Sequence, residues 1–176
     1  MVNNKNIIII DAETTGLNSS IDEILQLSII DENKKILLDE YYKPQKATSW
    51  VEAEAVNGIS PTDVADKPPI KKYLSKIQSI IDHADLIIGY NVNFDLSFLE
   101  SIGIDISKVE TYDVMFAFAP IYGEWNEQYG TYKWQKLTKC AAYYNYDWSK
   151  DGLSAHNSLA DCFATLHCYL EMTKDK

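Results

Sequence analysis

Two carboxylates near the N-terminus have a spacing that suits metal chemistry. Asp11 and Glu13 come directly after four consecutive isoleucines, residues 7–10, which predict a strand buried on both faces. Side chains two apart on a strand point to the same face, so both acids should project together near its end. Buried neighbouring acids resist ionisation unless a cation joins them, and oxygen ligands favour a hard divalent ion. An acidic surface turn explains these two residues equally well.

Three residues farther along the chain are candidates for the same site. Asp95 follows a short apolar segment, residues 84–90, and lies in the first turn of an expected helix, where the helix dipole alone also favours a carboxylate. If that segment pairs with the first strand, Asp95 lies beside the first two acids, because ligands gather at strand ends. His156 and Asp161 are five apart, about 140° around a helix. We therefore expect His156 in a loop before the last helix and Asp161 on the inner face of that helix.

The apolar pattern elsewhere predicts alternating strands and helices. Asparagine and glycine at 57 and 58 should end a first short helix, and Ser60 with Pro61 should begin a second. Residues 120–132 are rich in aromatic side chains and predict a long loop. The expected strands lie within 7–10, 21–31, 35–42, 84–90 and 111–114, and the expected helices within 49–66 (two), 70–83, 91–102, 114–119, 133–144 and 158–172.

Composition limits the classes of protein and partner. The chain has 176 residues and 46% hydrophobic residues, which is typical of one soluble globular domain. It has neither a membrane-length apolar run nor the apolar core of a secretory signal, so we expect a cytoplasmic protein. The net charge is −10 and no arginine is present, which argues against coating or reading duplex DNA. The three cysteines (Cys140, Cys162 and Cys168) lack zinc-site spacing, and we interpret them as reduced core residues.

Three ordered motifs resemble those of the DnaQ-like 3′–5′ exonucleases of the DEDD superfamily, in the subfamily with a catalytic histidine. The D-x-E-T/S-T-G-L motif of that family corresponds to residues 11–17, the asparagine-containing motif that ends in F-D to 91–95, and H-x4-D to 156–161. The N-G-I-S segment at 57–60 also matches. The resemblance covers about residues 6–171. The sister subfamily has tyrosine four residues before the last acid, where this chain has Asn157.

The resemblance implies a fold and a set of site residues. The fold is ribonuclease-H-like, with a mixed five-stranded sheet and helices on both faces. Two Mg²⁺ or Mn²⁺ ions about 4 Å apart would be bound by four acids, and His156 would take a proton from the attacking water as general base, because histidine exchanges protons near neutral pH. The implied metal ligands are Asp11, Glu13, Asp95 and Asp161, and the implied substrate contacts are Thr14, Thr15, Gly16, Leu17, Asn91 and Phe94.

The implied activity is release of nucleoside 5′-monophosphates from 3′ ends. Metal contacts and base stacking ignore base identity, so single-stranded ends are the expected substrate, with DNA favoured and RNA trimming as the alternative. The aromatic loop and lysines 133, 136 and 139 are candidates for strand contacts. The enzyme could act alone, in repair, or as the proofreading subunit of a DNA polymerase. A haloacid-dehalogenase-like phosphatase fits poorly, because Glu13 replaces its second aspartate, and a non-catalytic binding module would not need all five site residues.

Overall fold

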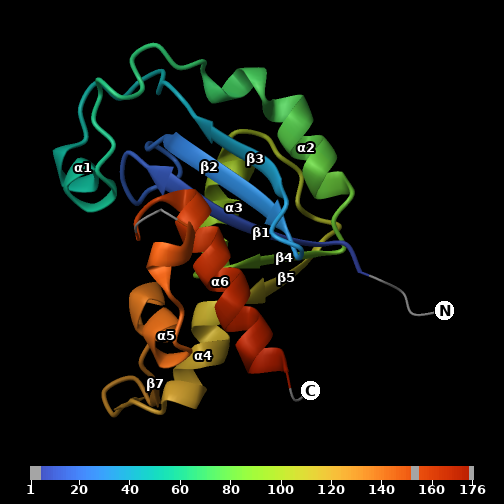
Figure 1. The fold of residues 1–176 in the computed structure, drawn as a ribbon. Coiled ribbons are helices and arrows are strands. Elements are labelled where there is room, and N and C mark those ends of the chain that lie inside the picture. The colour runs from blue at the N-terminus through green and yellow to red at the C-terminus, as the bar shows by residue number, and fades with distance from the viewer. Residues whose placement is uncertain (1–4, 152–154, 175–176) are drawn as a thin grey trace.

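The protein folds around one mixed sheet (Figure 1). The structure is a computed structural model that describes residues 5–151 and 155–174. The sheet has the strand order β3-β2-β1-β4-β5, in which β1 is antiparallel to β2 and parallel to β4. This arrangement confirms the predicted mixed five-stranded sheet. Its strands are β1 (Ile7–Thr14), β2 (Ile24–Asp31), β3 (Ile36–Tyr41), β4 (Leu86–Gly89) and β5 (Glu110–Asp113).

Helices cover both faces of this sheet, as predicted. In Figure 1, α6 crosses in front of the sheet and α3 lies behind it. The helices are α1 (Val51–Asn57), α2 (Leu74–Asp82), α3 (Val92–Ser101), α4 (Val114–Tyr122), α5 (Leu137–Tyr143) and α6 (Ser158–Thr173), with short 3-10 turns at Ile70–Lys72 and Trp148–Asp151. Within the described part of the chain, no helix is long and apolar enough to cross a membrane.

Successive side chains of β1 point to opposite faces of the sheet, and the core accordingly has two layers. Ile8 and Ile10 pack with α2 and α3 on one face, whereas Ile9 packs with α4, α5 and α6 on the other. Both layers are shielded from solvent, since these isoleucines are at most 4% exposed. Asp11 and Glu13 continue the row of Ile9, so the two acids lie on the side of the sheet that α6 covers. The strand also extends to Thr14, four residues beyond the predicted 7–10.

The structure corrects the prediction of a second short helix after Ser60. Residues 61–66 form successive turns instead, with backbone bonds such as Asp63 N to Ser60 O, three residues apart. The side chain of Asp63 also accepts bonds from Ser60. Ala65 N and Lys67 N likewise donate three residues back, to Thr62 O and Val64 O, and Pro68 and Pro69, which have no N–H, follow the segment.

The aromatic segment is more regular than a loop. Helix α4 continues past Pro120 to Tyr122, because a proline removes only one hydrogen bond there, and it ends at Gly123 with φ 79°. A ribbon of β6 (Trp125–Asn126) and β7 (Thr131–Tyr132) follows. Lys133 N extends the ribbon by donating to Glu124 O (2.7 Å). Residues 133–136 are therefore not helical, and α5 begins at Leu137, four residues later than predicted.

Candidate metal centre and nucleotide pocket

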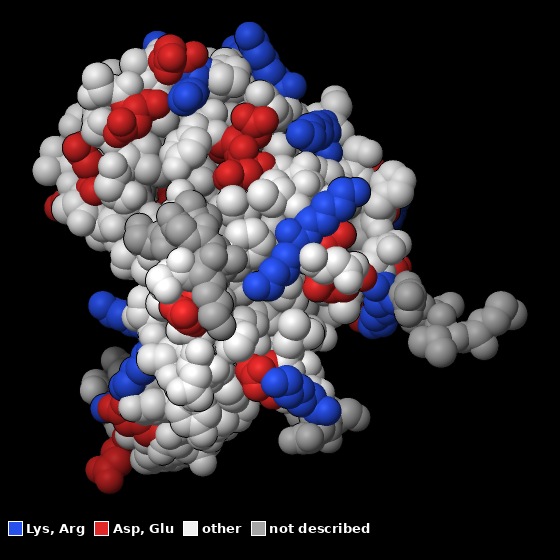
Figure 2. Space-filling view, viewed as in Figure 1, with Lys and Arg blue, Asp and Glu red and all other residues white. Residues whose placement is uncertain are grey.

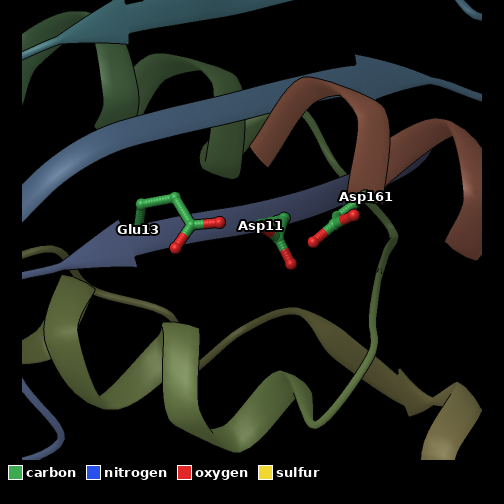
Figure 3. Close-up of side chains that lie close together, drawn as sticks. All are labelled: Asp11, Glu13 and Asp161. Atoms are coloured by element: carbon green, nitrogen blue, oxygen red, sulfur yellow. The ribbon is translucent and has the colours of Figure 1, made fainter. Parts of the chain in front are cut away.

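Three carboxylates converge beside the end of β1. Asp11 and Glu13 project from the strand and Asp161 projects from the first turn of α6 toward them (Figure 3). Each offers an oxygen, and these atoms lie within 4.8 Å of one another. The structure thus brings together residues 150 positions apart in the sequence, as the motif spacing predicts. The roles of these residues stay predictions.

Burial makes the ionised form of each acid unfavourable in the absence of a cation. Burial raises the pKa of Asp11 well above its usual value, and the negative charges of Asp161, Asp95 and Glu13 add to the rise. Burial and Asp161 raise the pKa of Glu13 to about 8, although a hydrogen bond from Asn57 opposes this. Burial raises the pKa of Asp161 to about 7. A bound cation would reverse these shifts.

One oxygen of this cluster is left without a hydrogen-bonding partner. The Oδ1 atom of Asp161 is buried and accepts no hydrogen bond. Buried polar atoms are nearly always paired, because an unpaired one costs about 1–3 kcal/mol. An unpaired carboxylate oxygen in a residue that lies close to two more carboxylates is a good ligand for a hard cation. The residues present therefore fit a divalent metal ion.

Asp95 reaches β1 from the opposite layer. It lies in the first turn of α3, is 3% exposed, and accepts a hydrogen bond from Ala12 N at 2.9 Å. The pairing of β4 with β1 ends at Ile9, so β4 offers no carbonyl to the N–H of Ala12. The Asp95 carboxylate accepts this hydrogen bond instead. Burial raises the pKa of Asp95, and Glu13 adds to the rise. Asp95 therefore lies in the field of the cluster, although it is not among the three mutually closest acids.

His156 lies immediately before α6, as predicted. It is exposed, with φ 67°, and the cap of the helix is the next residue, Asn157, whose side chain accepts from Leu159 N and Ala160 N. A hydrogen bond from the backbone of His156 lowers the pKa of Asp161 in opposition to burial. The histidine thus enters from the chain just ahead of the helix that carries Asp161.

A cavity of about 830 Å³ opens next to the acids, large enough for a nucleotide. Glu13 is among the residues that line it, and other walls come from the turn after β1 and from α1. The lining includes four of the predicted substrate contacts from that turn, and Phe94 as well: Thr14, Thr15, Gly16, Leu17 and Phe94. Leu17 is 87% exposed at the rim, whereas Phe94 also packs on Phe98 in the core.

The turn after β1 uses its polar groups to hold its own shape. Thr14 Oγ1 donates to Gly16 O at 2.6 Å, and Thr15 Oγ1 donates to Asp22 at 3.2 Å. A Cβ on Gly16 would lie 2.5 Å from an Asp22 oxygen, so glycine leaves the Asp22 carboxylate room to accept from Thr15 Oγ1 and Asn18 N. Asn91 does not line the cavity: it is exposed and its backbone N–H donates to Asp113. The structure therefore separates Asn91 from the other predicted substrate contacts.

Several lining residues were not predicted from the sequence. Trp50, Val51 and Val56 form the wall that α1 contributes, and Asn57 Nδ2 donates to Thr14 O at 3.2 Å. The structure marks this wall by exposure: α1 buries none of its residues and its valines are more than 60% exposed. A helix that leaves its apolar side chains exposed is available to face a ligand.

Comparisons with known proteins identify the family. A model of the RNase_T family, described as an exonuclease family, matches residues 8–169. The chain is 34% identical over 173 residues to the uncharacterized exonuclease CP81 of Escherichia phage 186, which covers 90% of this chain and 84% of that protein. It is 24% identical over 174 residues to the PolC-type DNA polymerase III of Staphylococcus saprophyticus. This alignment covers 95% of this chain and 11% of the polymerase.

Solved structures confirm the ribonuclease-H-like fold. Exonuclease I of E. coli in complex with a dA16 oligonucleotide superposes with a TM-score of 0.74 at 18% identity, over 97% of this chain and 42% of that one. The chain thus spans most of its phage relative but less than half of exonuclease I and about a tenth of the polymerase. Because the family model matches residues 8–169, nearly the whole chain, this protein is a nuclease that belongs to the RNase_T family of DnaQ-like 3′–5′ exonucleases.

Proposed function

We propose that the protein removes nucleoside 5′-monophosphates from single-stranded 3′ ends, preferably of DNA, in proofreading or repair. One observation carries this proposal: three carboxylates within 4.8 Å of one another lie beside a cavity of nucleotide size. The oligonucleotide bound to E. coli exonuclease I supports a single-stranded DNA substrate. On the face in Figure 2, acidic and basic residues are interspersed and form no broad basic band, which fits an end-directed enzyme better than a duplex-coating one.

Four acids are proposed to hold two Mg²⁺ or Mn²⁺ ions. Asp11, Glu13 and Asp161 provide the convergent oxygens, and the adjacent Asp95 is the fourth ligand. Bound divalent ions would supply positive charge that stabilises a phosphodiester under attack and its leaving oxygen. In their absence, the raised pKa values keep the cluster partly protonated near neutral pH.

His156 is proposed as the general base. Its backbone donates a hydrogen bond to Asp161, and its side chain is exposed and not committed to the core, which suits a group that takes a proton from water. The φ of 67° and the Asn157 cap fix the backbone on both sides of the side chain. The imidazole therefore projects from the residue just before the cap of α6.

The cavity is proposed to hold the 3′-terminal nucleotide. Its apolar walls, Trp50, Val51, Val56 and Leu17, suit a base without reading its hydrogen-bonding edge. Glu13 belongs both to the lining of the cavity and to the acid cluster, so it would link the bound nucleotide to the phosphate that is to be cleaved. Because the walls are apolar, we expect little preference among the four bases.

The strand upstream of the terminal nucleotide is proposed to cross the aromatic ribbon. Trp125 and Trp134 are 51% and 62% exposed, and each meets another ring edge-to-face, Tyr132 and Phe116 respectively. Exposed rings that are already oriented can stack on bases at a low entropic cost. Lys136 is exposed on the same segment and supplies positive charge in an otherwise acidic chain.

The test compares substrates directly. A 5′-labelled single-stranded DNA, the same DNA as a mismatched duplex, and short RNA are incubated with the protein and Mg²⁺ or Mn²⁺. Stepwise shortening from the 3′ end, fastest on single-stranded DNA and blocked by EDTA, supports the proposal. Faster loss of RNA would reassign the substrate, and no shortening of any polymer would overturn the proposal.

A further inference from the structure

A row of polar residues crosses the sheet beside the acids. Across the β1–β2 pair, Ser28 lies opposite Asp11 and Gln26 lies opposite Glu13, so their side chains share the face that α6 covers. Asp39 on β3 is the next residue in the row of Ser28. Gln26 is 1% exposed and Ser28 is fully buried. Buried polar side chains in the middle of an apolar strand need partners.

The partners of this row are at the N-terminus of α6. Ser28 Oγ donates to Asp39 Oδ1 at 2.8 Å, so its oxygen is free to accept from Ser158 Oγ, 2.6 Å away. Gln26 Nε2 donates to the same Asp39 oxygen at 3.1 Å, and Gln26 Oε1 accepts from Ser158 N at 3.3 Å. Ser158 is thus bonded to the sheet through both its side chain and its backbone.

Asn157 joins the same network while it caps the helix. Its Oδ1 accepts from Leu159 N and Ala160 N, and its Nδ2 donates to Tyr41 Oη at 3.1 Å and to Gln26 Oε1 at 3.5 Å. One side chain therefore ends the helix and ties that end to β2 and β3.

A second anchor lies one helical turn later. The Cys162 thiol, fully buried, approaches Ile9 O at 3.7 Å and Ser28 O at 3.5 Å. Ser158 and Cys162 are four apart and lie on one face of α6. Asp161 lies between these two anchors along the helix. The anchors therefore set where the Asp161 carboxylate stands relative to β1.

We propose that Gln26, Ser28, Asn157 and Ser158 are positioning residues that hold Asp161 at metal-binding distance from Asp11 and Glu13. The inference rests on the proposed metal-dependent function. Hydrogen bonds are directional, whereas apolar contacts allow a helix to slide by a fraction of an ångström. The hydrogen bonds at 2.6–3.3 Å therefore fix both the position of α6 along the strand and its rotation. Three acids that repel one another would otherwise drive α6 away from β1.

The test removes single hydroxyl groups and measures metal binding as well as catalysis. Ser158→Ala loses the bond to Ser28, and Tyr41→Phe loses the bond from Asn157 at a partly exposed position. Thr173→Val is the matched control, because Thr173 Oγ1 bonds only to backbone oxygens near the other end of α6. Mn²⁺ affinity is measured by calorimetry, kcat and KM on a single-stranded oligonucleotide by product release, and folding by circular dichroism.

We expect Ser158→Ala to bind Mn²⁺ about threefold to tenfold more weakly and to lose kcat by a similar factor, with KM unchanged. Tyr41→Phe should change both quantities in the same direction by a smaller factor, and Thr173→Val should change neither. If Ser158→Ala fails to fold, Tyr41→Phe decides. Folded variants with Mn²⁺ affinity and kcat within about twofold of an active unmodified protein would overturn the positioning role alone. An unmodified protein that binds no Mn²⁺ and is inactive would overturn the proposed function and this inference with it.

Discussion

Replacing Asp161 with asparagine should stabilise the metal-free protein at alkaline pH. The substitution keeps the shape of the side chain and removes its charge. In the folded protein the pKa of Asp161 is raised from 3.8 to about 7, so the folded state keeps a proton that the unfolded chain releases. The folded state is therefore favoured at low pH and loses stability as the pH rises from about 4 to about 7. Glu13, whose pKa is about 8, extends the loss further.

The size of this effect follows from the pKa. At about 1.36 kcal/mol per pKa unit, a rise from 3.8 to about 7 corresponds to about 4 kcal/mol of stability lost by pH 8. Asp161 is only partly buried, so screening reduces the loss, and we expect about 2–3 kcal/mol. Asp161→Asn should avoid this loss and also lower the pKa of Asp11, since one repelling charge is gone. At pH 5, where Asp161 is protonated, the two proteins should be equally stable.

The assay is urea unfolding in EDTA at pH 5 and pH 8, followed by tryptophan fluorescence. Glu32→Gln, at an exposed site in the turn between β2 and β3, is the charge-matched control. Because it keeps Asp161, it should lose stability between pH 5 and pH 8 by the same amount as the unmodified protein. Added Mg²⁺ should stabilise the unmodified protein at pH 8 and Asp161→Asn much less. Equal stabilities of the unmodified protein and Asp161→Asn at both pH values would refute the assignment of a buried, mutually repelling cluster.

Three further substitutions test other parts of the account. His156→Ala should lower kcat by about 10²–10⁴-fold and leave calorimetric Mn²⁺ affinity unchanged; collapse of that affinity would instead make His156 a ligand. Trp134→Ala should raise KM for a long single strand by roughly tenfold and leave the KM of a dinucleotide unchanged, and equal effects on both would argue against an upstream strand path across the ribbon. Gly16→Ala should cost about 1–3 kcal/mol in thermal unfolding, because its Cβ would meet Asp22 at 2.5 Å, and an unchanged melting temperature would contradict that steric argument.

The sequence was most informative where chemistry and periodicity coincide. The two-residue spacing of Asp11 and Glu13 on a strand predicts a shared face, and the structure places both on the side of α6. The five-residue spacing of His156 and Asp161 correctly predicts a histidine ahead of the helix. Both inferences depend on local geometry alone, which the chain specifies residue by residue.

Features that depend on long-range packing could not be predicted. Gln26 and Ser28 are visible as polar residues in an apolar strand, but their partners on α6 are 130 or more positions away. Predicting the wall formed by Trp50 and α1 would require knowing that α1 leaves its valines exposed beside the turn after β1. The non-helical segment before α5 depends on Lys133 pairing with the ribbon, a contact that overrides its helical pattern.

The most direct test of the central claim compares the unmodified protein with Asp11→Ala on 5′-labelled single-stranded DNA in Mg²⁺. Asp11 lies between Glu13 and Asp161 and faces both, so its loss should empty the centre of the cluster. We predict a ladder of 3′-shortened products, with release of nucleoside 5′-monophosphates, for the unmodified protein, and none for folded Asp11→Ala. Undiminished Mg²⁺-dependent shortening by folded Asp11→Ala would contradict the assignment of a catalytic metal centre to these carboxylates.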